Sequence, residues 1–292
     1  MKNTRILVIK SILVLTILAV GSMPISVSAS YRSGNDEFRD ALDSALTKII
    51  DVDDTYDTIY AKWFPGESDA TDDTTASTVK VFPAKDTITG GGTLDNIITS
   101  GEIHFGSDMT YTPFEMLGAT GVAELDDGSG DKVSGFDADI AVAIAAEFST
   151  AYGETIKAVF HPSAWDPIIP NLEAGEFDAI ISGMTKTTER DQVVDFTRSY
   201  FTSSQALMAG PLYTDDGLNI TTVSELNSAS ISVSVQTSTT GDIWAQANIP
   251  NANIKAYDTY DAQILALENK DVHVTIADFP VLAFFSSENP EK

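Results

Sequence analysis

Cysteine is absent from the 292 residues of this sequence, and basic residues are scarce. Without cysteine the chain has no disulfide, no thiolate metal site and no lipid-modified cysteine to hold it at a membrane. Lys and Arg number 17 against 43 Asp and Glu, which gives a formal charge of −26. Such a surface repels nucleic acid and opposes self-association, so we expect a monomer without nucleic-acid partners. It would attract a cationic ligand, and it is equally typical of solubility at high ionic strength.

Motifs for several common chemistries are missing as well. The sequence has no phosphate-binding glycine loop, no HExxH zinc motif and no Ser-His-Asp arrangement. Its histidines, His104, His161 and His273, lie in or beside expected strands without the spacing of metal ligands. We therefore expect no cofactor, no metal site and no catalytic residue.

The one long apolar run lies near the N-terminus. Three cations precede the uncharged run 12–20, and small residues at 27–29 offer a cleavage site. This pattern predicts a signal peptide over residues 1–29 and a secreted protein, extracellular or periplasmic. Removing it takes the formal charge from −26 to −29, because three cations and no acids are lost. The alternative is an uncleaved segment that associates with the membrane, although the run is short for a span of about 20 residues.

Periodicity then indicates the secondary structure. Residues 36–64 have apolar positions at three- and four-residue spacing, which favours helices. Residues 66–78 are polar and acidic and are typical of a linker. From Thr93 onward strands and helices alternate in two blocks, which predicts two lobes of α/β architecture with mainly parallel sheets. The expected strands are 103–106, 156–160, 177–182, 231–235, 254–257 and 272–277, and the expected helices are 137–150, 164–174, 240–247 and 259–269.

Polar residues follow the ends of several expected strands, where parallel α/β sheets bind ligands. A guanidinium such as that of Arg190 suits a carboxylate, and hydroxyls with free N–H groups at a helix N-terminus complete its coordination. A carboxylate such as that of Asp278 suits an ammonium. Together these groups would bind a zwitterion. Taken singly, each is more often structural, and Arg190 beside Asp191 is typical of a solvated ion pair.

From Thr93 to about Phe285 the chain resembles the extracellular solute-binding proteins for polar amino acids that deliver substrate to ABC importers. The order and spacing of the matching motifs make the resemblance specific. They are Gly101-x-Ile103-x-Phe105-Gly106, Asp108-x-x-Tyr111-x-Pro113-Phe114-Glu115, Gly135-Phe136-Asp137-x-Asp139-Ile140-Ala141, Trp165-Asp166-x-Ile168-Ile169-Pro170, Ser182-Gly183-Met184-Thr185-x-Thr187-x-x-Arg190 and Val194-Asp195-Phe196-Thr197-x-x-Tyr200.

The resemblance implies a two-lobed, periplasmic-binding-protein-like fold of class II and a set of ligand-binding residues. Tyr111 and Trp165 match aromatic walls, Gly183 a backbone contact, and Thr185 and Arg190 carboxylate ligands of lobe one. In lobe two, Thr239 and Thr240 match the second carboxylate site, and Asp278 matches the ammonium partner. Asp108 matches a position able to contact a cationic side chain. The family's turn usually has glycine where this chain has Ser238, which puts that loop's geometry in question.

The two ends of the sequence depart from the family pattern. The family's chain leaves lobe two by a second crossing strand and finishes with helices that pack on lobe one, and residues 34–66 resemble those helices. We therefore expect a circular permutation: helices completing lobe 1 at 30–66, a linker at 67–92, lobe 1 at 93–205, lobe 2 at 206–285 and a tail at 286–292. A truncated or tandem gene is the alternative.

The expected function is extracellular binding of a free amino acid, polar or cationic, and its delivery to the membrane subunits of an ABC importer by hinge closure. Two alternatives stay open. The same fold serves as a ligand sensor in signalling systems, and some relatives are dehydratases or lyases, which would need a general acid or base in the cleft.

Overall fold

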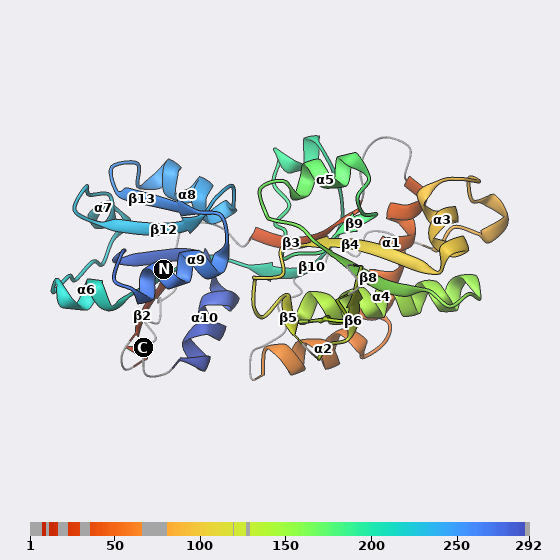
Figure 1. The fold of residues 1–292 in the computed structure, drawn as a ribbon, viewed down its shortest axis with the longest axis horizontal. Coiled ribbons are helices and arrows are strands. Elements are labelled where there is room, and N and C mark those ends of the chain that lie inside the picture. The colour runs from red at the N-terminus through yellow and green to blue at the C-terminus, as the bar shows by residue number, and fades with distance from the viewer. Residues whose placement is uncertain are drawn as a thin grey trace. The chain divides into compact units, whose positions relative to one another are not determined.

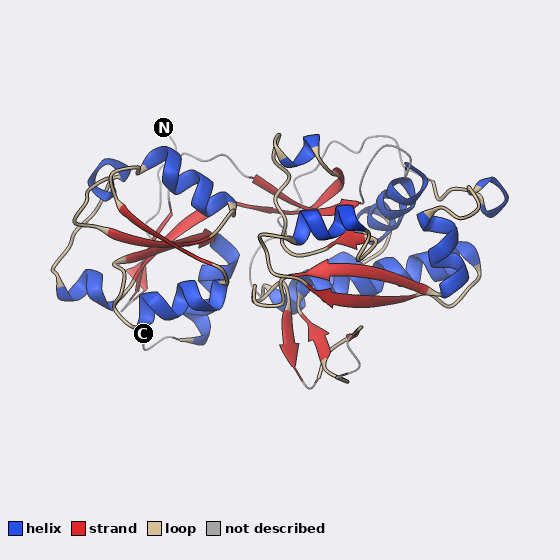
Figure 2. Cartoon of the chain, turned by 45° about the horizontal axis from the view of Figure 1, so that its top comes forward, coloured by secondary structure: helices blue, strands red, loops and turns tan. Residues whose placement is uncertain are grey.

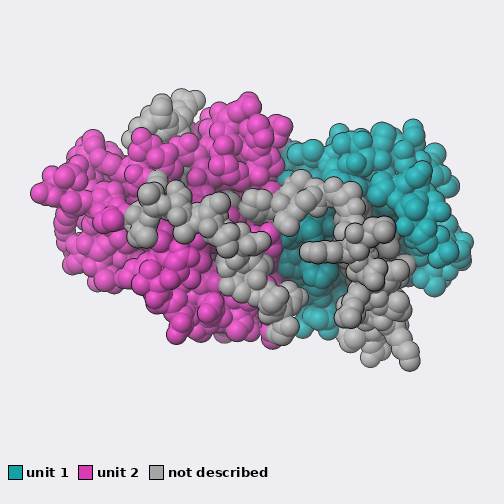
Figure 3. Space-filling view, turned by 180° about the vertical axis from the view of Figure 1, so that it is seen from behind, with its two compact units in different colours: residues 1–22, 203–292 teal, residues 23–202 magenta. Residues whose placement is uncertain are grey.

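The computed structural model describes residues 8–9, 12–16, 23–29, 36–65, 81–118, 120–126 and 129–289, with the backbone alone for residues 8–29. The chain divides into two compact units (Figure 3). Unit 1 comprises Met1–Ser22 and Ser203–Lys292, and unit 2 comprises Met23–Thr202. The chain thus passes from one unit to the other twice. The expected lobe 1 falls in unit 2 and the expected lobe 2 in unit 1.

Unit 2 contains an eight-stranded mixed sheet of order β10-β3-β9-β4-β8-β6-β7-β5. The run β9-β4-β8-β6 is parallel, whereas β3, β7 and β5 pair antiparallel with their neighbours. The expectation of a mainly parallel sheet therefore holds for the centre of the sheet only. The strands are β3 (Met23–Ala29), β4 (Glu102–Ser107), β5 (Met116–Gly118), β6 (Ala123–Leu125), β7 (Lys132–Ser134), β8 (Lys157–Pro162), β9 (Ala179–Ile180) and β10 (Asp195–Ser203).

Helices cover this sheet, α5 on one face and α4 on the other (Figure 1). Helix α4 follows the expected span of helix-forming residues, begins after Gly135 and ends at the left-handed Gly153. Many of its 17 residues are buried and apolar, and they form much of the apolar layer under the sheet. The helices of unit 2 are α1 (Asp36–Asp51), α2 (Thr55–Trp63), α3 (Thr93–Ser100), α4 (Phe136–Tyr152) and α5 (Ile168–Ala174), with 3-10 turns η1 (Lys85–Thr87) and η2 (Arg190–Gln192).

Helices α1 and α2 pack on α4 and so belong to the core of unit 2, although they lie far from α4 along the sequence. The apolar stripe of α1 is buried, and Phe38 meets Phe148 edge-on at 6.3 Å. Polar contacts also join both helices to β10. Tyr56 Oη donates to the Tyr200 carbonyl at 2.7 Å, and the Arg198 N–H donates to Asp43 Oδ1 at 2.8 Å.

Unit 1 contains a six-stranded sheet of order β1-β2-β11-β14-β12-β13. Strand β12 pairs parallel with β13 and β14, and β11 pairs antiparallel with β14 and with β2. Helices lie on both faces of this sheet (Figure 2). The strands are β1 (Val8–Ile9), β2 (Ile12–Thr16), β11 (Gln205–Ala209), β12 (Ser232–Gln236), β13 (Asn253–Tyr257) and β14 (Val274–Asp278). The helices are α6 (Pro211–Asp215), α7 (Val223–Leu226), α8 (Thr240–Asn248), α9 (Tyr260–Glu268) and α10 (Phe279–Glu288).

The residues expected to form a signal peptide contribute strands β1 to β3 in the part of the chain that the structure describes. Strand β2 pairs with β11 in unit 1, and β3 pairs with β9 in unit 2 through Ser28 and Ala29. In the described ranges, no helix combines the length and apolar character needed to cross a membrane. Most of the expected linker, residues 67–80, and the end of the expected tail, residues 290–292, lie outside the described residues.

Candidate functional site

Unit 2 gathers six of the predicted binding residues in the loops that follow β4, β8 and β9. Ser182 joins two of these loops, because its hydroxyl accepts the Asp108 N–H at 3.0 Å and donates to Glu115 Oε1 at 2.6 Å. Gly183 has φ +54, and a Cβ there would lie 3.2 Å from the Tyr111 ring, so a side chain would press on that ring. We call this set the first half-site: Asp108, Tyr111, Trp165, Gly183, Thr185 and Arg190.

Arg190 is oriented by its neighbours within this half-site. Its Nη1 donates to the Thr185 carbonyl at 2.8 Å, and its guanidinium lies 5.1 Å from the centroid of the Trp165 ring. Two acids close to it in the sequence pair with other cations: Asp191 binds Lys186 at 2.9 Å, and Asp195 lies 3.7 Å from Arg39. A guanidinium that lies on an aromatic face is held in one orientation, in which its N–H donors can bind both oxygens of a carboxylate.

A buried carboxyl pair lies beneath the first half-site. The Gly183 N–H donates to Asp137 Oδ2 at 2.6 Å, and Tyr200 Oη donates to Asp137 Oδ1 at 2.8 Å. Burial raises the pKa of Asp137 to about 7, against these hydrogen bonds, which lower it. Burial, followed by the charge of Asp137, raises the pKa of Glu115 well above its usual range. A proton on Glu115 can be donated to Asp137, which satisfies the otherwise unbonded Glu115 Oε2.

The Gly183 N–H is already bound to Asp137, so this amide is not available to a ligand. The sequence matched Gly183 only to a backbone contact, and it assigned no role to Glu115, Asp137 or Tyr200. These three residues did belong to the matched motifs. Their burial in one network was the missing information.

Unit 1 brings together the other three predicted residues at the carboxyl ends of β12 and β14. Thr239 is the N-cap of α8, and its hydroxyl accepts the Asp242 N–H at 3.3 Å. Thr240 begins α8, so its N–H lies among the unpaired donors of the first helical turn, which attract carboxylates. Asp278 ends β14 and is only 6% exposed. We call Thr239, Thr240 and Asp278 the second half-site.

Gln205 connects the members of the second half-site, although none of the matching sequence motifs includes it. Its Nε2 donates to Thr240 Oγ1 at 3.0 Å and to Asp278 Oδ1 at 2.5 Å. Gln205 is 2% exposed and opens β11, whose antiparallel register pairs it with Asp278. The available signal was one polar residue at the start of an otherwise apolar strand, Gln205–Ala209.

The turn before α8 resolves the doubt over Ser238. This residue adopts φ +61, the left-handed conformation that glycine usually supplies, and its N–H donates to Asp242 Oδ2 at 3.1 Å. The turn is therefore retained without glycine. The backbone at Gly241 passes close to Gln205, and a Cβ there would lie 3.1 Å from Gln205 Oε1.

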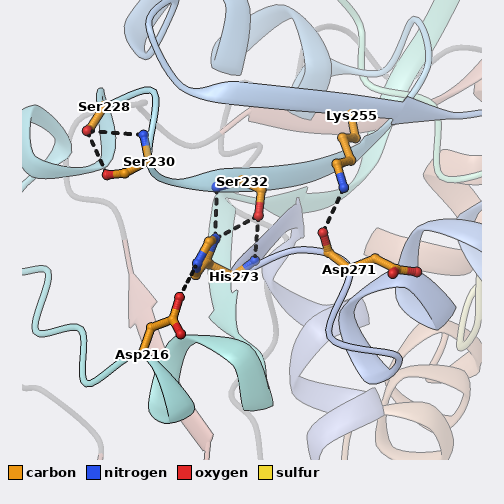
Figure 4. Close-up of polar contacts among 7 residues, drawn as sticks. All are labelled: Asp216, Ser228, Ser230, Ser232, Lys255, Asp271 and His273. Atoms are coloured by element: carbon orange, nitrogen blue, oxygen red, sulfur yellow. Dashed lines mark hydrogen bonds and ion pairs between the residues drawn. The ribbon is translucent and has the colours of Figure 1, made fainter.

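The expectation that no Ser-His-Asp arrangement is present was wrong, because the structure brings Ser232, His273 and Asp216 together from separate parts of the chain (Figure 4). His273 Nδ1 lies 2.6 Å from Ser232 Oγ and also accepts the Ser232 N–H at 2.9 Å, so the ring proton is on Nε2, 3.0 Å from Asp216 Oδ2. Ser232 is 6% exposed within β12. The backbone bond and the burial fit a latch that ties β12, β14 and α6 together.

The other two histidines meet on the sheet of unit 2. His104 Nδ1 lies 2.6 Å from His161 Nε2, and Asp126 Oδ2 lies 3.6 Å from the same nitrogen. Burial lowers the pKa of His161, and the neighbouring His104 lowers it further. His104, His161 and Asp126 are close enough to hold a metal ion between them. The spacing of the histidines along the sequence did not indicate this grouping.

Comparison with known proteins agrees with the fold. Residues 103–212 match the family model of bacterial extracellular solute-binding proteins, family 3. A solved ancestral amino acid-binding protein, described as a precursor of cyclohexadienyl dehydratase, is 30% identical with a TM-score of 0.58; the match covers 68% of this chain and 78% of that one. This chain belongs to the family 3 extracellular solute-binding proteins.

Other amino acid-binding proteins are similar at comparable levels. The ABC transporter arginine-binding protein 1 of Escherichia coli is 28% identical over 65% of this chain and 68% of its own length. The arginine-binding periplasmic protein of Mannheimia haemolytica is 32% identical over 60% of this chain and 62% of its own length. A solved ancestral arginine-binding protein bound to arginine is 28% identical with a TM-score of 0.54, over 65% and 76% of the two chains. The chain thus spans roughly two thirds of the curated relatives that it matches.

Proposed function

We propose that this family 3 protein binds a free amino acid outside the cytoplasm and delivers it to an ABC importer. The observation that carries the proposal is the opposite chemistry of the two half-sites. Arg190, held by Thr185 and Trp165, offers donors to a carboxylate, and Asp278, held by Gln205 beside Thr240, offers acceptors to an ammonium. An α-amino acid carries both groups on one carbon.

In the proposed mechanism, one ligand molecule contacts both half-sites. The ligand stabilises the closed form only through contacts that are absent from the open form. The chain crosses between the units after residue 202, in a segment that signal-peptide cleavage would keep, and that crossing would act as the hinge. An importer would recognise the closed form.

A cationic amino acid is the ligand class that we favour. Asp108 supplies a second carboxylate, 7% exposed, at the end of β4 beside the Gly183 loop. The net charge of −26 would also raise the local concentration of a cation. Two of the related proteins are named for arginine binding.

A thermal-shift screen of the twenty standard amino acids, followed by calorimetry on each that shifts the melting temperature, tests the proposal. Ligands raise apparent stability by mass action, so a true ligand gives a shift that grows with its concentration. We expect a shift from arginine, lysine or histidine. The absence of any shift with all twenty at millimolar concentration would refute amino-acid binding.

Two other functions compete with transport. A ligand-sensing role would use the same half-sites, and it is distinguished by whether the bound form engages importer subunits or a receptor. Dehydratase or lyase activity would require a group that titrates within reach of the ligand. Burial raises the pKa of both carboxyls in the Glu115–Asp137 pair. Their hydrogen bonds, however, go to Ser182, Gly183 and Tyr200 of the protein itself. A turnover assay with cyclic acids and glycans distinguishes this activity from binding.

We further propose that the chain is circularly permuted, with residues 30–66 completing lobe 1 behind a cleavable signal peptide. The packing of α1 and α2 on α4 supports this order. Cleavage after Ala29 would remove β1 to β3, and with them the β2–β11 pairing of three residue pairs and the β3–β9 pairing of two. Intact mass of the secreted protein tests the cleavage. Deletion of residues 31–66 tests the permutation, since an unchanged melting temperature and affinity would refute it.

A further inference from the structure

A compact group of nitrogen and oxygen ligands lies on the sheet of unit 2, outside both half-sites. It comprises His104 from β4, His161 from β8 and Asp126, which follows β6. These three strands are neighbours in the order β4-β8-β6. The register pairs His104 with Val159 and Gly106 with His161, so both rings project from the same face, two positions apart along adjacent strands.

The contact between the two rings limits what can lie between them. His104 Nδ1 and His161 Nε2 are 2.6 Å apart, so these two atoms cannot both carry a proton. Between these two nitrogens there is at most one proton, and the nitrogen that carries it donates to the lone pair of the other. A metal ion can replace that single proton and accept both lone pairs.

Asp126 and Glu102 complete the arrangement. Asp126 Oδ2 lies 3.6 Å from His161 Nε2, and its side chain is 57% exposed, so it can rotate toward an ion without disturbing the core. Glu102 Oε2 lies 3.6 Å from His104 Nε2. A carboxylate at that position holds the ring with Nδ1 toward the ion, as carboxylates behind metal-binding histidines commonly do.

We propose that His104, His161 and Asp126 bind a divalent transition-metal ion with the preferences of Zn²⁺, with water completing the coordination. Zn²⁺ takes nitrogen at about 2.0–2.1 Å in tetrahedral geometry, which separates two nitrogen ligands by about 3.3 Å. The two rings would therefore move apart by roughly 0.7 Å on binding, a small rotation for partly exposed side chains. The ion would link three neighbouring strands and stabilise unit 2.

The site is separate from amino-acid binding. His104 lies four positions before Asp108 along the chain, in the middle of β4 rather than at its carboxyl end. A metal ion here would therefore affect stability, and amino-acid affinity should change little when the site is removed.

Calorimetry with ZnCl₂ on EDTA-treated full-length protein tests the proposal, together with thermal melts and the visible spectrum of the Co²⁺-loaded protein. The variants are His104→Ala, His161→Gln, Asp126→Asn and Glu102→Gln. Asp131→Asn, an exposed acid elsewhere in unit 2, is the matched control. Excess Mg²⁺ is kept present to suppress weak binding to the acidic surface.

We expect one Zn²⁺ per chain, a higher melting temperature with Zn²⁺ and the intense tetrahedral Co²⁺ bands. Glu102→Gln should weaken binding by about 10-fold, and loss of either histidine should weaken it by more than the ~100-fold typical of an outer partner. Asp131→Asn should bind as wild type does. Zn²⁺ binding unchanged in His161→Gln, or octahedral Co²⁺ bands in the wild type, would overturn the proposal even if another variant failed to fold.

Discussion

Gln205 Nε2 donates a hydrogen bond of 2.5 Å to Asp278 Oδ1. The two residues face each other across the β11–β14 pair, and the same amide nitrogen also binds Thr240. The Asp278 carboxylate is therefore fixed in direction by its own unit. Gln205 uses one of its acceptor sites, and a carboxylate is an acceptor-only group that suits an ammonium.

Replacing Gln205 with Ala should weaken amino-acid binding by about tenfold, because Thr240 and Asp278 lose a shared donor worth roughly 1–2 kcal/mol. Calorimetry measures the change. The matched control is Gln246→Ala, which removes an amide bound to Asp242 on α8 and should leave affinity unchanged. Wild-type affinity in Gln205→Ala would show that Gln205 does not position the second half-site.

Replacing Arg190 should reduce affinity more than replacing a nearby cation. Arg190→Ala leaves a desolvated ligand carboxylate unpaired, at a cost of about 2–5 kcal/mol, and Arg190→Lys restores the charge without the two-pronged geometry or the contact with Trp165. Lys186→Ala removes an equal charge from the same loop, where Lys186 pairs with Asp191. Equal losses in Arg190→Ala and Lys186→Ala, measured by calorimetry, would reduce the role of Arg190 to general attraction.

The Asp137 carboxyl should make stability depend on pH. Its pKa rises from an ordinary 3.8 to about 7 on folding. The folded state therefore holds a proton that the unfolded state has lost over most of the range from pH 4 to pH 7. Its contribution to stability is complete below pH 4 and declines, by up to about 1.4 kcal/mol per pH unit, as pH rises toward 7.

Urea unfolding at several pH values from 4 to 8 measures this decline. In Asp137→Asn the decline should be smaller, because the amide cannot ionise, while Asp131→Asn should follow the wild type. The introduced amide can still accept the Gly183 N–H through its oxygen and donate to Tyr200 Oη through its nitrogen, so the variant should fold. Identical slopes for Asp137→Asn and wild type would contradict the raised pKa.

Truncating the buried face of α1 should destabilise the protein as a core substitution does. Leu42 is fully buried, so Leu42→Ala should lower the free energy of unfolding by about 2–5 kcal/mol. The control, Val52→Ala, alters a side chain that is 69% exposed and should have little effect. Urea denaturation that gives similar values for both variants would show that α1 is dispensable to unit 2.

The sequence predicted the long periodic elements and missed those determined by pairing. Helix 137–150 and the strands 231–235 and 254–257 were found within two residues, because their apolar pattern or helix-forming composition is strong. Strands β5 to β7 were missed, since each has only three residues and no period to read. The strand expected at 177–182 shortens to Ala179–Ile180, because the chain turns out of the sheet toward Gly183.

The same distinction applies to the site. The predicted binding residues lie at or after strand ends in the structure, and their role in binding stays a prediction. Gln205 was missed because its partner, Asp278, is 73 positions away and meets it only through the antiparallel register. His104 and His161, 57 positions apart, meet through the register of β4 and β8. No local spacing encodes either relationship.

The central claim is that Arg190 binds the carboxylate and Asp278 the ammonium of one amino acid. Calorimetry should compare the amino acid with the largest thermal shift against its decarboxylated amine and its Nα-acetyl derivative, on wild type and Arg190→Ala. We predict that wild type binds both analogues at least about 30-fold more weakly, the loss of a buried charged pairing of about 2 kcal/mol or more. In Arg190→Ala the decarboxylated amine should bind about as well as the amino acid. An analogue that binds wild type as tightly as the amino acid would contradict the account.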